Sequence, residues 1–198
     1  MVTPREVELI FREAGAFREG HFVLASGKHS SHYLEKFQVL QWPVRTAALC
    51  ADIAEWAQSI GPRTVAGPTT GGIILAHEVA RQMELRAVYA ERIENAPGRE
   101  FRRPFELGST ERVLVVDDIM TTGGSVQETI DAVRGAGAQV VGAAVLVDRS
   151  GGSATIDVPL HALWTVEIPT YAPADCPQCA AGVPLAKPGT TPAQVANR

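Results

Sequence analysis

Hydrophobic positions along this chain follow two different spacings, and their order predicts an α/β fold. Between residues 62 and 150, short continuous apolar runs, typical of strands buried on both faces, alternate with segments in which apolar residues recur at helix spacing. The strands are expected at "TVAG", "AVYAE", "RVLVVDD" and "VVGAAVLVD", and the helices at about 72 to 83 and 124 to 135. Strands interleaved with helices in this way predict a mostly parallel sheet with right-handed crossovers.

The segments on either side of this region predict smaller elements. Residues 4 to 16 have the pattern of an amphipathic helix, and a second helix is expected from about 43 to 60, where Gly61-Pro62 ends it. Between them, residues 20 to 40 alternate and are rich in turn residues, which favours an antiparallel hairpin or a small subdomain. After about residue 168, proline and small residues dominate, as in a tail that packs over a domain.

We expect one domain over residues 1–198, because the length and the 45% hydrophobic content suffice for one substantial core. The core is expected at about residues 43–150, and a smaller part at about 15–42 and 149–185. The last residues, 186–198, are expected to be frayed.

Charge and hydropathy disfavour two classes of partner. The chain has 18 basic and 22 acidic residues, a net charge of −4, whereas a nucleic-acid-binding face needs a basic surplus. No apolar run approaches the roughly 18 residues of a membrane span, and Glu6, Glu8 and Glu13 stand where a signal peptide would be apolar. We therefore expect a cytoplasmic protein without nucleic-acid or membrane partners.

The three cysteines are too few for a disulfide framework and fit a reducing compartment. Cys176 and Cys179 form a CPQC sequence, which is typical of half a zinc site or of a redox pair. Zinc needs two more ligands, and His161 and Cys50 are the loose candidates because the chain has neither a second CxxC nor an HxxxH. The sequence favours a simpler interpretation, a tight turn in the C-terminal segment, over metal binding.

The strongest chemical signal is "RVLVVDDIMTTGGSVQETI", residues 112–130. Val113 to Val116 predict a buried strand that ends in two adjacent carboxylates, Asp117 and Asp118, before a glycine turn and a helical pattern. Open α/β sheets bind their ligands at the carboxyl ends of strands, so these charges indicate a site rather than a core defect.

The residues after the carboxylates have the pattern of an anion cradle. In the segment 121–125, glycines permit a tight turn, the helix start supplies unpaired backbone N–H groups, and hydroxyls add donors. The segment lacks the GxxxxGK[ST] of a P-loop and the GxGxxG of a dinucleotide fold, which disfavours nucleoside triphosphates and NAD. Carboxylates followed by a phosphate cradle describe a ribose 5-phosphate, with sugar hydroxyls at Asp117 and Asp118.

"VLVVDDIMTTGGS" resembles the signature of the type I phosphoribosyltransferases, which bind phosphoribosyl pyrophosphate, and the likeness to that class covers about residues 62–150. "FVLASGKHSSHYLEKFQVL" and "LVDRSGG" are similar to segments that flank the base site in the orotate phosphoribosyltransferase family, and "CPQCAAGVPL" resembles a tail in one bacterial branch of it. With these segments the likeness extends from about residue 15 to 185. The resemblance implies a type I phosphoribosyltransferase fold, a mostly parallel central sheet flanked by helices with a small hood of N- and C-terminal segments.

The resemblance also implies the chemistry, which is transfer of a phosphoribosyl group from phosphoribosyl pyrophosphate to orotate. The products are orotidine 5′-monophosphate and pyrophosphate, a step of pyrimidine biosynthesis. A homodimer is implied, with Mg²⁺ held mainly by the substrate and no metal ligand assigned to the protein. The residues implied as catalytic are Asp117, Asp118 and Arg92. Those implied to bind phosphoribosyl pyrophosphate are Asp117, Asp118, Thr121, Thr122, Gly123, Gly124, Ser125, Thr70, Gly71, Gly72 and Lys28, and those implied to bind orotate are Arg149, Thr121, Tyr33, Leu34 and Lys28.

Three of these assignments have a competing interpretation. Arg149 offers a planar fork for the orotate carboxylate, but it could instead pair with the adjacent Asp148 at the surface. "GPTTGGI", residues 67–73, matches the pyrophosphate loop of the class, but a plain turn would also use these glycines. Lys28 is expected to reach the base or the pyrophosphate, and its alternative is a solvated lysine.

One segment departs from the family pattern. The family's mobile catalytic loop usually carries an Arg-Lys pair and then a lysine and a histidine that act across a dimer interface. The corresponding segment here, "ERIENAPGREFRRPFELGS", contains no lysine and no histidine. Glu91 and Arg92 fall where the pair would be, which leaves Arg92, Arg99, Arg102 and Arg103 to neutralise pyrophosphate. Arginine donates no proton at neutral pH, so we expect electrostatic stabilisation by magnesium and arginine to suffice.

Two other functions are compatible with the motifs. A purine phosphoribosyltransferase would keep the fold and bind its base by aromatic stacking, without a cationic partner such as Arg149. A regulatory protein would bind phosphoribosyl pyrophosphate without turnover, which the missing loop lysine and histidine favour. If it acted on DNA, such a regulator would need a basic face or a helix-turn-helix segment, and the sequence has neither.

Overall fold

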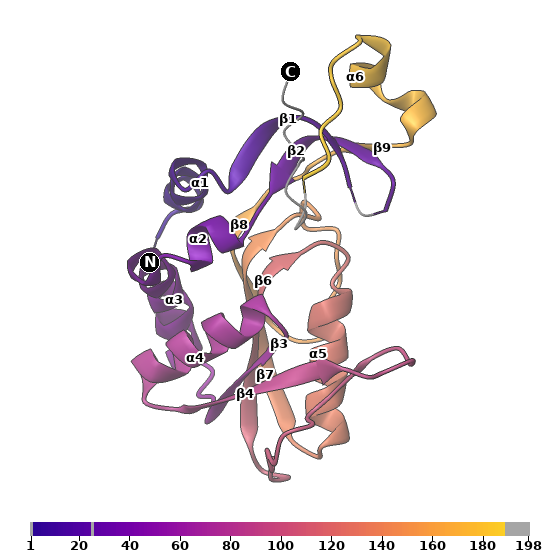
Figure 1. Ribbon diagram of the computed structural model, residues 1–198. Coiled ribbons are helices and arrows are strands. Elements are labelled where there is room, and N and C mark those ends of the chain that lie inside the picture. Colours follow the sequence, from indigo (N-terminus) through magenta and orange to yellow (C-terminus); the bar gives the residue numbers. More distant parts are fainter. Residues whose placement is uncertain (1, 25, 189–198) are drawn as a thin grey trace, which may run out of the picture. The chain divides into compact units, whose positions relative to one another are not determined.

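The computed structural model describes residues 2–24 and 26–188, and the chain divides into two compact units (Figure 1). The first unit comprises Met1–Ala16 and Glu35–Glu167, and the second comprises Phe17–Leu34 and Ile168–Arg198. The predicted single domain with its core and hood stays a prediction. Most of the segment expected to be frayed, from residue 189 onward, lies outside the described residues.

A six-stranded sheet in the order β5-β4-β3-β6-β7-β8 forms the centre of the first unit. Its strands are β3 (Thr64–Pro68), β4 (Arg86–Arg92), β5 (Arg99–Glu100), β6 (Arg112–Met120), β7 (Gln139–Asp148) and β8 (Leu160–Thr165). The helices of this unit are α1 (Pro4–Glu13), α2 (Phe37–Leu40), α3 (Pro43–Gln58), α4 (Gly71–Met83) and α5 (Gly124–Gly135).

The sheet confirms the predicted α/β fold, because all neighbouring pairs except β4 with β5 are parallel. The four strands expected from apolar runs are β3, β4, β6 and β7, and the two predicted helices between them are α4 and α5. β5 and β8 were not predicted from the sequence. β5 has only two residues, and His161 interrupts the apolar residues of β8, so neither forms a continuous apolar run.

β6 is longer than the predicted strand, which ended in the two carboxylates. The strand continues through Asp117 and Asp118 to Met120, because β7 pairs with it as far as Asp148. Its other neighbour, β3, pairs only as far as Val115. The last residues of β6 therefore have a neighbouring strand on one edge and the loop after β3 on the other.

Apolar side chains on both faces of the sheet explain its position. On one face Val126, Ile130 and Val133 of α5 pack against alternate strand residues such as Val113 and Val115, as the helical spacing predicts. On the other face lie α3 and α4, which contact each other and the strands (Figure 1). Leu114 and Val116, which alternate with the α5-facing residues, are also fully buried.

Three helix boundaries in the first unit follow from local chemistry. α1 begins after a capping box formed by Thr3 and Glu6, and it ends at Glu13, before the residue 16 that the pattern predicted. Gly15, at φ 67°, turns the chain out of the helix. α3 begins at Pro43, as predicted, because proline is compatible with the first turn.

The second unit contains a three-stranded antiparallel sheet and two short helices. The strands, in the order β1-β2-β9, are β1 (Phe17–Val23), β2 (His29–Leu34) and β9 (Thr170–Tyr171), and the helices are η1 (Pro173–Asp175) and α6 (Pro177–Ala180). The predicted antiparallel hairpin is thereby confirmed. Within the described residues of both units, no helix has the length and apolar character needed to cross a bilayer.

Candidate functional site

The site in the first unit lies where the order of strands reverses. From β3 the chain passes through α4 to β4 on one side, and from β6 it passes through α5 to β7 on the other. Because β3 and β6 are parallel neighbours, the loops that follow them leave the same edge of the sheet side by side. Open α/β sheets bind ligands at such a point.

The two carboxylates at the end of β6 point to opposite faces of the strand, because successive strand residues alternate. Asp117 is on the α5 side, where Ser125 hydrogen-bonds to it, and Asp118 is on the side of α4, against Gly71. Both are buried, with 6% and 2% exposure. Each carboxylate therefore adjoins one of the two glycine loops that the sequence singled out.

Asp118 is held between a backbone loop and a lysine. Its Oδ1 accepts a hydrogen bond from Ile119 N at 2.7 Å, and Lys36 Nζ lies 3.0 Å from its Oδ2. A Cβ added to Gly71 would overlap Oδ2, so this position requires glycine. Burial raises the pKa of Asp118, and the Lys36 ammonium acts in the opposite direction.

Asp117 has no such close cationic partner among the residues that the structure describes. Its Oδ1 accepts a hydrogen bond from Asp118 N at 2.9 Å. Burial, together with the neighbouring Asp118 carboxylate, raises the pKa of Asp117 to about 7. In the ligand-free protein this carboxyl group is therefore poised between its neutral and charged forms near neutral pH.

A cavity of about 260 Å³ adjoins Asp117 at the start of α5. Gly123 enters the helix at φ 83°, and no described side chain caps the first turn, so backbone N–H groups face the cavity. The residues predicted to bind the 5-phosphate thus line one cavity, together with one arginine from β4. The residues that line the cavity are Arg92, Asp117, Ile119, Met120, Thr121, Thr122, Gly123, Gly124, Ser125, Val126 and Glu128.

The second glycine loop, between β3 and α4, also presents an uncapped helix start. Among the described residues no side chain caps α4, whose first residues Gly71 and Gly72 are buried while Thr70 is exposed. Thr69 N donates to Ala90 O at 3.0 Å, which ties the loop to β4. The predicted pyrophosphate residues therefore lie together, next to Asp118.

Arg99 connects the two loops, a role that the sequence did not indicate. Its guanidinium donates to Thr69 Oγ1 at 3.2 Å and to Ser125 Oγ at 3.1 Å. Arg99 Nε also lies 3.3 Å from Glu128 Oε2, as opposed charges rather than an aligned hydrogen bond. Burial lowers the pKa of Arg99, with the positive charge of Arg92 acting in the same direction. Both arginines thus bring positive charge to the cradle.

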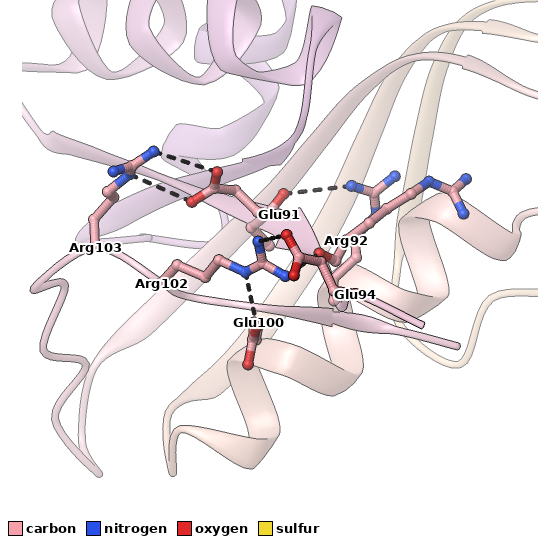
Figure 2. Close-up of polar contacts among 8 residues, drawn as sticks. Glu91, Arg92, Glu94, Glu100, Arg102 and Arg103 are labelled. Carbon is pink, nitrogen blue, oxygen red and sulfur yellow. Dashed lines mark hydrogen bonds and ion pairs between the residues drawn. The ribbon is translucent and has the colours of Figure 1, made fainter. Parts of the chain in front are cut away.

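The other two arginines of this segment are engaged in surface ion pairs (Figure 2). Arg102 lies between Glu94 and Glu100, with nitrogen-to-oxygen distances of 3.6 and 2.8 Å, and Arg103 lies 3.4 Å from Glu91. Arg92, by contrast, makes no side-chain ion pair within the described part of the chain. The structure thereby separates the arginine run into two residues at the cradle and two on the surface.

Arg149 stands beside the cradle rather than paired with its neighbour. Its backbone N–H donates to Met120 O at 2.8 Å, which places the residue next to Thr121, the other first-unit residue predicted to bind orotate. The Asp148 carboxylate instead accepts hydrogen bonds from Ser150 and Gly152. Partial burial lowers the pKa of Arg149.

Lys28, Tyr33 and Leu34, the remaining predicted base-site residues, belong to the second unit. Tyr33 pairs with Arg18 across the β1–β2 hairpin, and its ring lies 5.8 Å from that of Phe22. Leu34 pairs with Phe17, and Lys28 immediately precedes β2. Lys36, the first-unit lysine that contacts Asp118, was missed; its rarity, as one of three lysines, was the available signal.

The candidates proposed as further zinc ligands have other surroundings. His161 Nε2 lies 2.7 Å from Asp52 Oδ1, and Cys50 is fully buried in α3, where burial raises its pKa to about 12. Neither of these two loose candidates is among the side chains that converge with Cys176 and Cys179. The side chains that converge with the two cysteines are His21 and His29 of the β1–β2 hairpin.

Comparison with known proteins identifies relatives over most of the chain. Residues 38–163 match the phosphoribosyl transferase domain. The orotate phosphoribosyltransferase of Desulforamulus reducens is 48% identical over 185 residues, which cover 93% of this chain and 96% of the relative. That of Pelotomaculum thermopropionicum is 47% identical over 189 residues, covering 96% of this chain and 98% of the relative. The crystal structure of orotate phosphoribosyltransferase from Aeropyrum pernix superposes with a TM-score of 0.68 at 29% identity, covering 80% of this chain and 93% of that one.

Proposed function

The chain belongs to the orotate phosphoribosyltransferase family, and from that premise we propose that it transfers the phosphoribosyl group of phosphoribosyl pyrophosphate to orotate. The observation that carries the proposal is the pair of uncapped helix starts on either side of two buried carboxylates. Two anion cradles match a substrate with a 5-phosphate and a pyrophosphate, and the carboxylates between them match the ribose hydroxyls.

Each group of the substrate has a complementary part of the site. The 5-phosphate binds at Thr121–Ser125 and the pyrophosphate at Thr70–Gly72. Asp117 accepts hydrogen bonds from ribose hydroxyls and Asp118 does so beside Lys36. Arg99, which bonds to both loops, fixes their separation, so the phosphoribosyl group is bound at both ends. Because the phosphoribosyl group is held at both ends, its C1′ atom is aligned with the incoming base.

Magnesium fits this arrangement as a substrate-bound ion. The ion prefers six oxygen ligands. Asp117 offers carboxylate oxygens at the cavity, whereas Asp118 already forms an ion pair with Lys36. Asp117 is therefore the residue that would hold Mg²⁺ beside the bound substrate. When bound, the ion neutralises charge that grows on the leaving pyrophosphate. Arg92 and Arg99 contribute fixed positive charge that also stabilises the leaving pyrophosphate. This charge offsets the loop's lack of lysine and histidine.

Arg149 orients orotate by binding its carboxylate with a bidentate fork. Arg149→Ala is expected to raise KM for orotate about 10- to 100-fold, since a hydrogen bond to a charged group contributes about 1.5–3 kcal/mol. Arg149→Lys keeps the charge but loses the fork, so it should restore only part of the affinity. Initial rates at varied orotate, with phosphoribosyl pyrophosphate saturating, measure both variants.

The same assay tests the proposed function against its two alternatives. Purified protein is supplied with phosphoribosyl pyrophosphate, Mg²⁺ and either orotate, adenine, guanine or hypoxanthine, and orotate consumption is followed by its ultraviolet absorbance. Turnover of orotate alone supports the proposal. Turnover of a purine that survives Arg149→Ala would favour a purine phosphoribosyltransferase, and binding of phosphoribosyl pyrophosphate without turnover of any base would favour a regulator.

We further propose that the protein is a homodimer through the surface formed by α2, α3 and α4. Large apolar side chains are exposed there: Trp42 is 55% and Val44 is 83% exposed, with Phe37 and Ile74 nearby at 42% and 37%. Ile74 lines a largely apolar cavity of about 350 Å³, together with Leu40 and Ile73. A dimer would bury this surface. Sedimentation velocity is expected to show a dimer, and Val44→Glu is expected to shift it toward monomer; a wild-type monomer would contradict the proposal.

A further inference from the structure

The second unit is small and has few apolar residues with which to form a core. Its described residues that are both hydrophobic and buried are Phe17, Phe22, Ile168 and Cys176. Two histidines, His21 and His29, are also buried, with 3% and 6% exposure. Units of this size rarely become stable through hydrophobic burial alone and often rely on a disulfide or a structural metal.

Four potential metal ligands converge in this unit. His21 and His29 come from the β1–β2 hairpin, and Cys176 and Cys179 come from the segment around α6; the four ligand atoms lie within 4.8 Å of one another. His21 Nε2 is 3.1 Å from His29 Nδ1 and 3.4 Å from Cys176 Sγ. Cys179 Sγ is 3.2 Å from His29 Nδ1 and 3.7 Å from His21 Nε2. The cysteines are free thiols.

The four separations just given, 3.1–3.7 Å, are close to the edge lengths of a tetrahedral zinc site. Zinc bonds of about 2.0–2.1 Å to nitrogen and about 2.3 Å to sulfur place ligand atoms about 3.3–3.8 Å apart. Hydrogen bonds between thiols and imidazoles would bring these side chains together only as donor–acceptor pairs. They would not require all four ligand atoms to lie within 4.8 Å of one another. Because the set is two thiolates and two imidazoles, it favours Zn²⁺ over the hard cations Mg²⁺ and Ca²⁺.

The surroundings of the cluster fix the ligands in a binding orientation. His21 Nδ1 lies 2.8 Å from Val183 O, to which only a protonated Nδ1 can donate, so the lone pair is left on Nε2, the atom that faces the cluster. The C-terminal segment is held to β1 by bonds from Gln178 Nε2 to Gly20 O and from Val23 N to Ala186 O, at 2.9 and 3.0 Å. The CPQC sequence is thereby brought to the hairpin.

We propose that His21, His29, Cys176 and Cys179 bind one Zn²⁺ ion as a structural site. Four protein ligands leave no open coordination position, so the ion has no catalytic role of its own. It links the β1–β2 hairpin to the C-terminal segment and thus stabilises the second unit, a structural role distinct from the phosphoribosyl chemistry proposed for the first.

Metal content tests the proposal directly. Protein expressed with zinc and purified without chelator is expected to contain one zinc per chain by inductively coupled plasma mass spectrometry. Cys179→Ser and His29→Gln should each reduce zinc to background after dialysis, whereas His32→Gln, a matched change on the same strand, should retain one. His32 Nδ1 contacts Ser31 Oγ at 2.9 Å and is not part of the cluster. Cys179 is the exposed member, so Cys179→Ser perturbs folding least.

Cobalt substitution supplies a readout that does not depend on the stability of the variants. Wild-type protein stripped of metal and loaded with Co²⁺ should show thiolate-to-cobalt charge-transfer absorbance and the intense visible bands of a tetrahedral ion, and one equivalent of Zn²⁺ should remove both. Zinc-free wild-type protein that fails to take up Co²⁺ or Zn²⁺, a Cys176–Cys179 disulfide under reducing purification, or full zinc content in both Cys179→Ser and His29→Gln would each overturn the proposal.

Discussion

Asp117→Asn is expected to lower kcat/KM for phosphoribosyl transfer about 10- to 150-fold and, at pH 8, to leave the free energy of unfolding unchanged or higher. The loss follows from replacing a charged acceptor of the ribose hydroxyls, since a hydrogen bond to a charged group contributes about 1.5–3 kcal/mol. The unchanged or higher stability follows from burial, because the amide fills the same volume without a charge to desolvate.

The sign of the stability effect depends on pH in a defined way. Burial and Asp118 raise the pKa of Asp117 to about 7 from the model-compound value of 3.8. A carboxyl group with a raised pKa in the folded state costs stability when it ionises, and that cost grows as pH rises from about 4 to about 7. The advantage of Asp117→Asn should therefore be small at pH 5 and larger at pH 8. Urea denaturation at the two pH values measures it.

Catalysis should depend on the same ionisation. The charged form of Asp117 predominates above pH 7, so wild-type kcat/KM is expected to fall as pH drops below about 7. Since phosphoribosyl pyrophosphate also titrates in this region, the informative quantity is the difference between the wild-type profile and that of Asp117→Asn. Asp131→Asn, an exposed change on α5, is the matched control and should leave both activity and stability near wild type. An Asp117→Asn protein that is fully active, or clearly less stable at pH 8, would contradict the proposed role.

Arg99→Met is expected to lower the free energy of unfolding by about 3 kcal/mol and to weaken binding of phosphoribosyl pyrophosphate. Removing one partner of a buried ion pair costs about 3–5 kcal/mol, and the lower end applies because the Glu128 side chain is 30% exposed. Thr69 and Ser125 would also lose their common donor, so the two loops would no longer be held at a fixed separation. For a chain of this length the melting temperature should fall by about 6–12 °C.

Arg102→Met provides the comparison for Arg99→Met. Arg102 lies on the surface between Glu94 and Glu100, and exposed pairs contribute about 0–1 kcal/mol. Thermal unfolding of both variants, with and without phosphoribosyl pyrophosphate, separates the two arginines. If the substrate stabilises Arg99→Met as strongly as it stabilises wild type, Arg99 does not position the loops. If Arg102→Met is destabilised as much as Arg99→Met, the burial of Arg99 is not the reason for its effect.

The local patterns of the first unit could be predicted from the sequence, whereas its long-range pairings could not. Apolar runs and helix spacing predicted β3, β4, β6 and β7 with the helices after β3 and β6, and the glycine pattern located the loops between strand and helix at both places. The ion pair of Lys36 with Asp118 joins residues that are distant in sequence. Arg99 could not be distinguished from the other arginines of its segment by sequence. Its contacts with Thr69 and Ser125 depend on the β4–β5 pairing, which the sequence did not indicate.

The two histidines of the proposed zinc site could not be identified from the sequence, for a similar reason. His21 and His29 are eight residues apart and have no metal-binding spacing along the chain. They approach each other because the hairpin pairs Val23 with His29 and Phe22 with Ser30. Sequence spacing detects ligands on one turn or helix, such as the CPQC pair, but ligands that meet across strands depend on register.

Product identification tests the central claim most directly. Wild-type protein is incubated with orotate, phosphoribosyl pyrophosphate and Mg²⁺, and orotidine 5′-monophosphate and pyrophosphate are quantified by chromatography beside an Asp117→Asn sample. We predict that the two products form in a one-to-one ratio at a rate at least about tenfold above that of the variant. Protein that binds phosphoribosyl pyrophosphate but forms no orotidine 5′-monophosphate would contradict the account, and would show that the arginines do not replace the loop lysine and histidine.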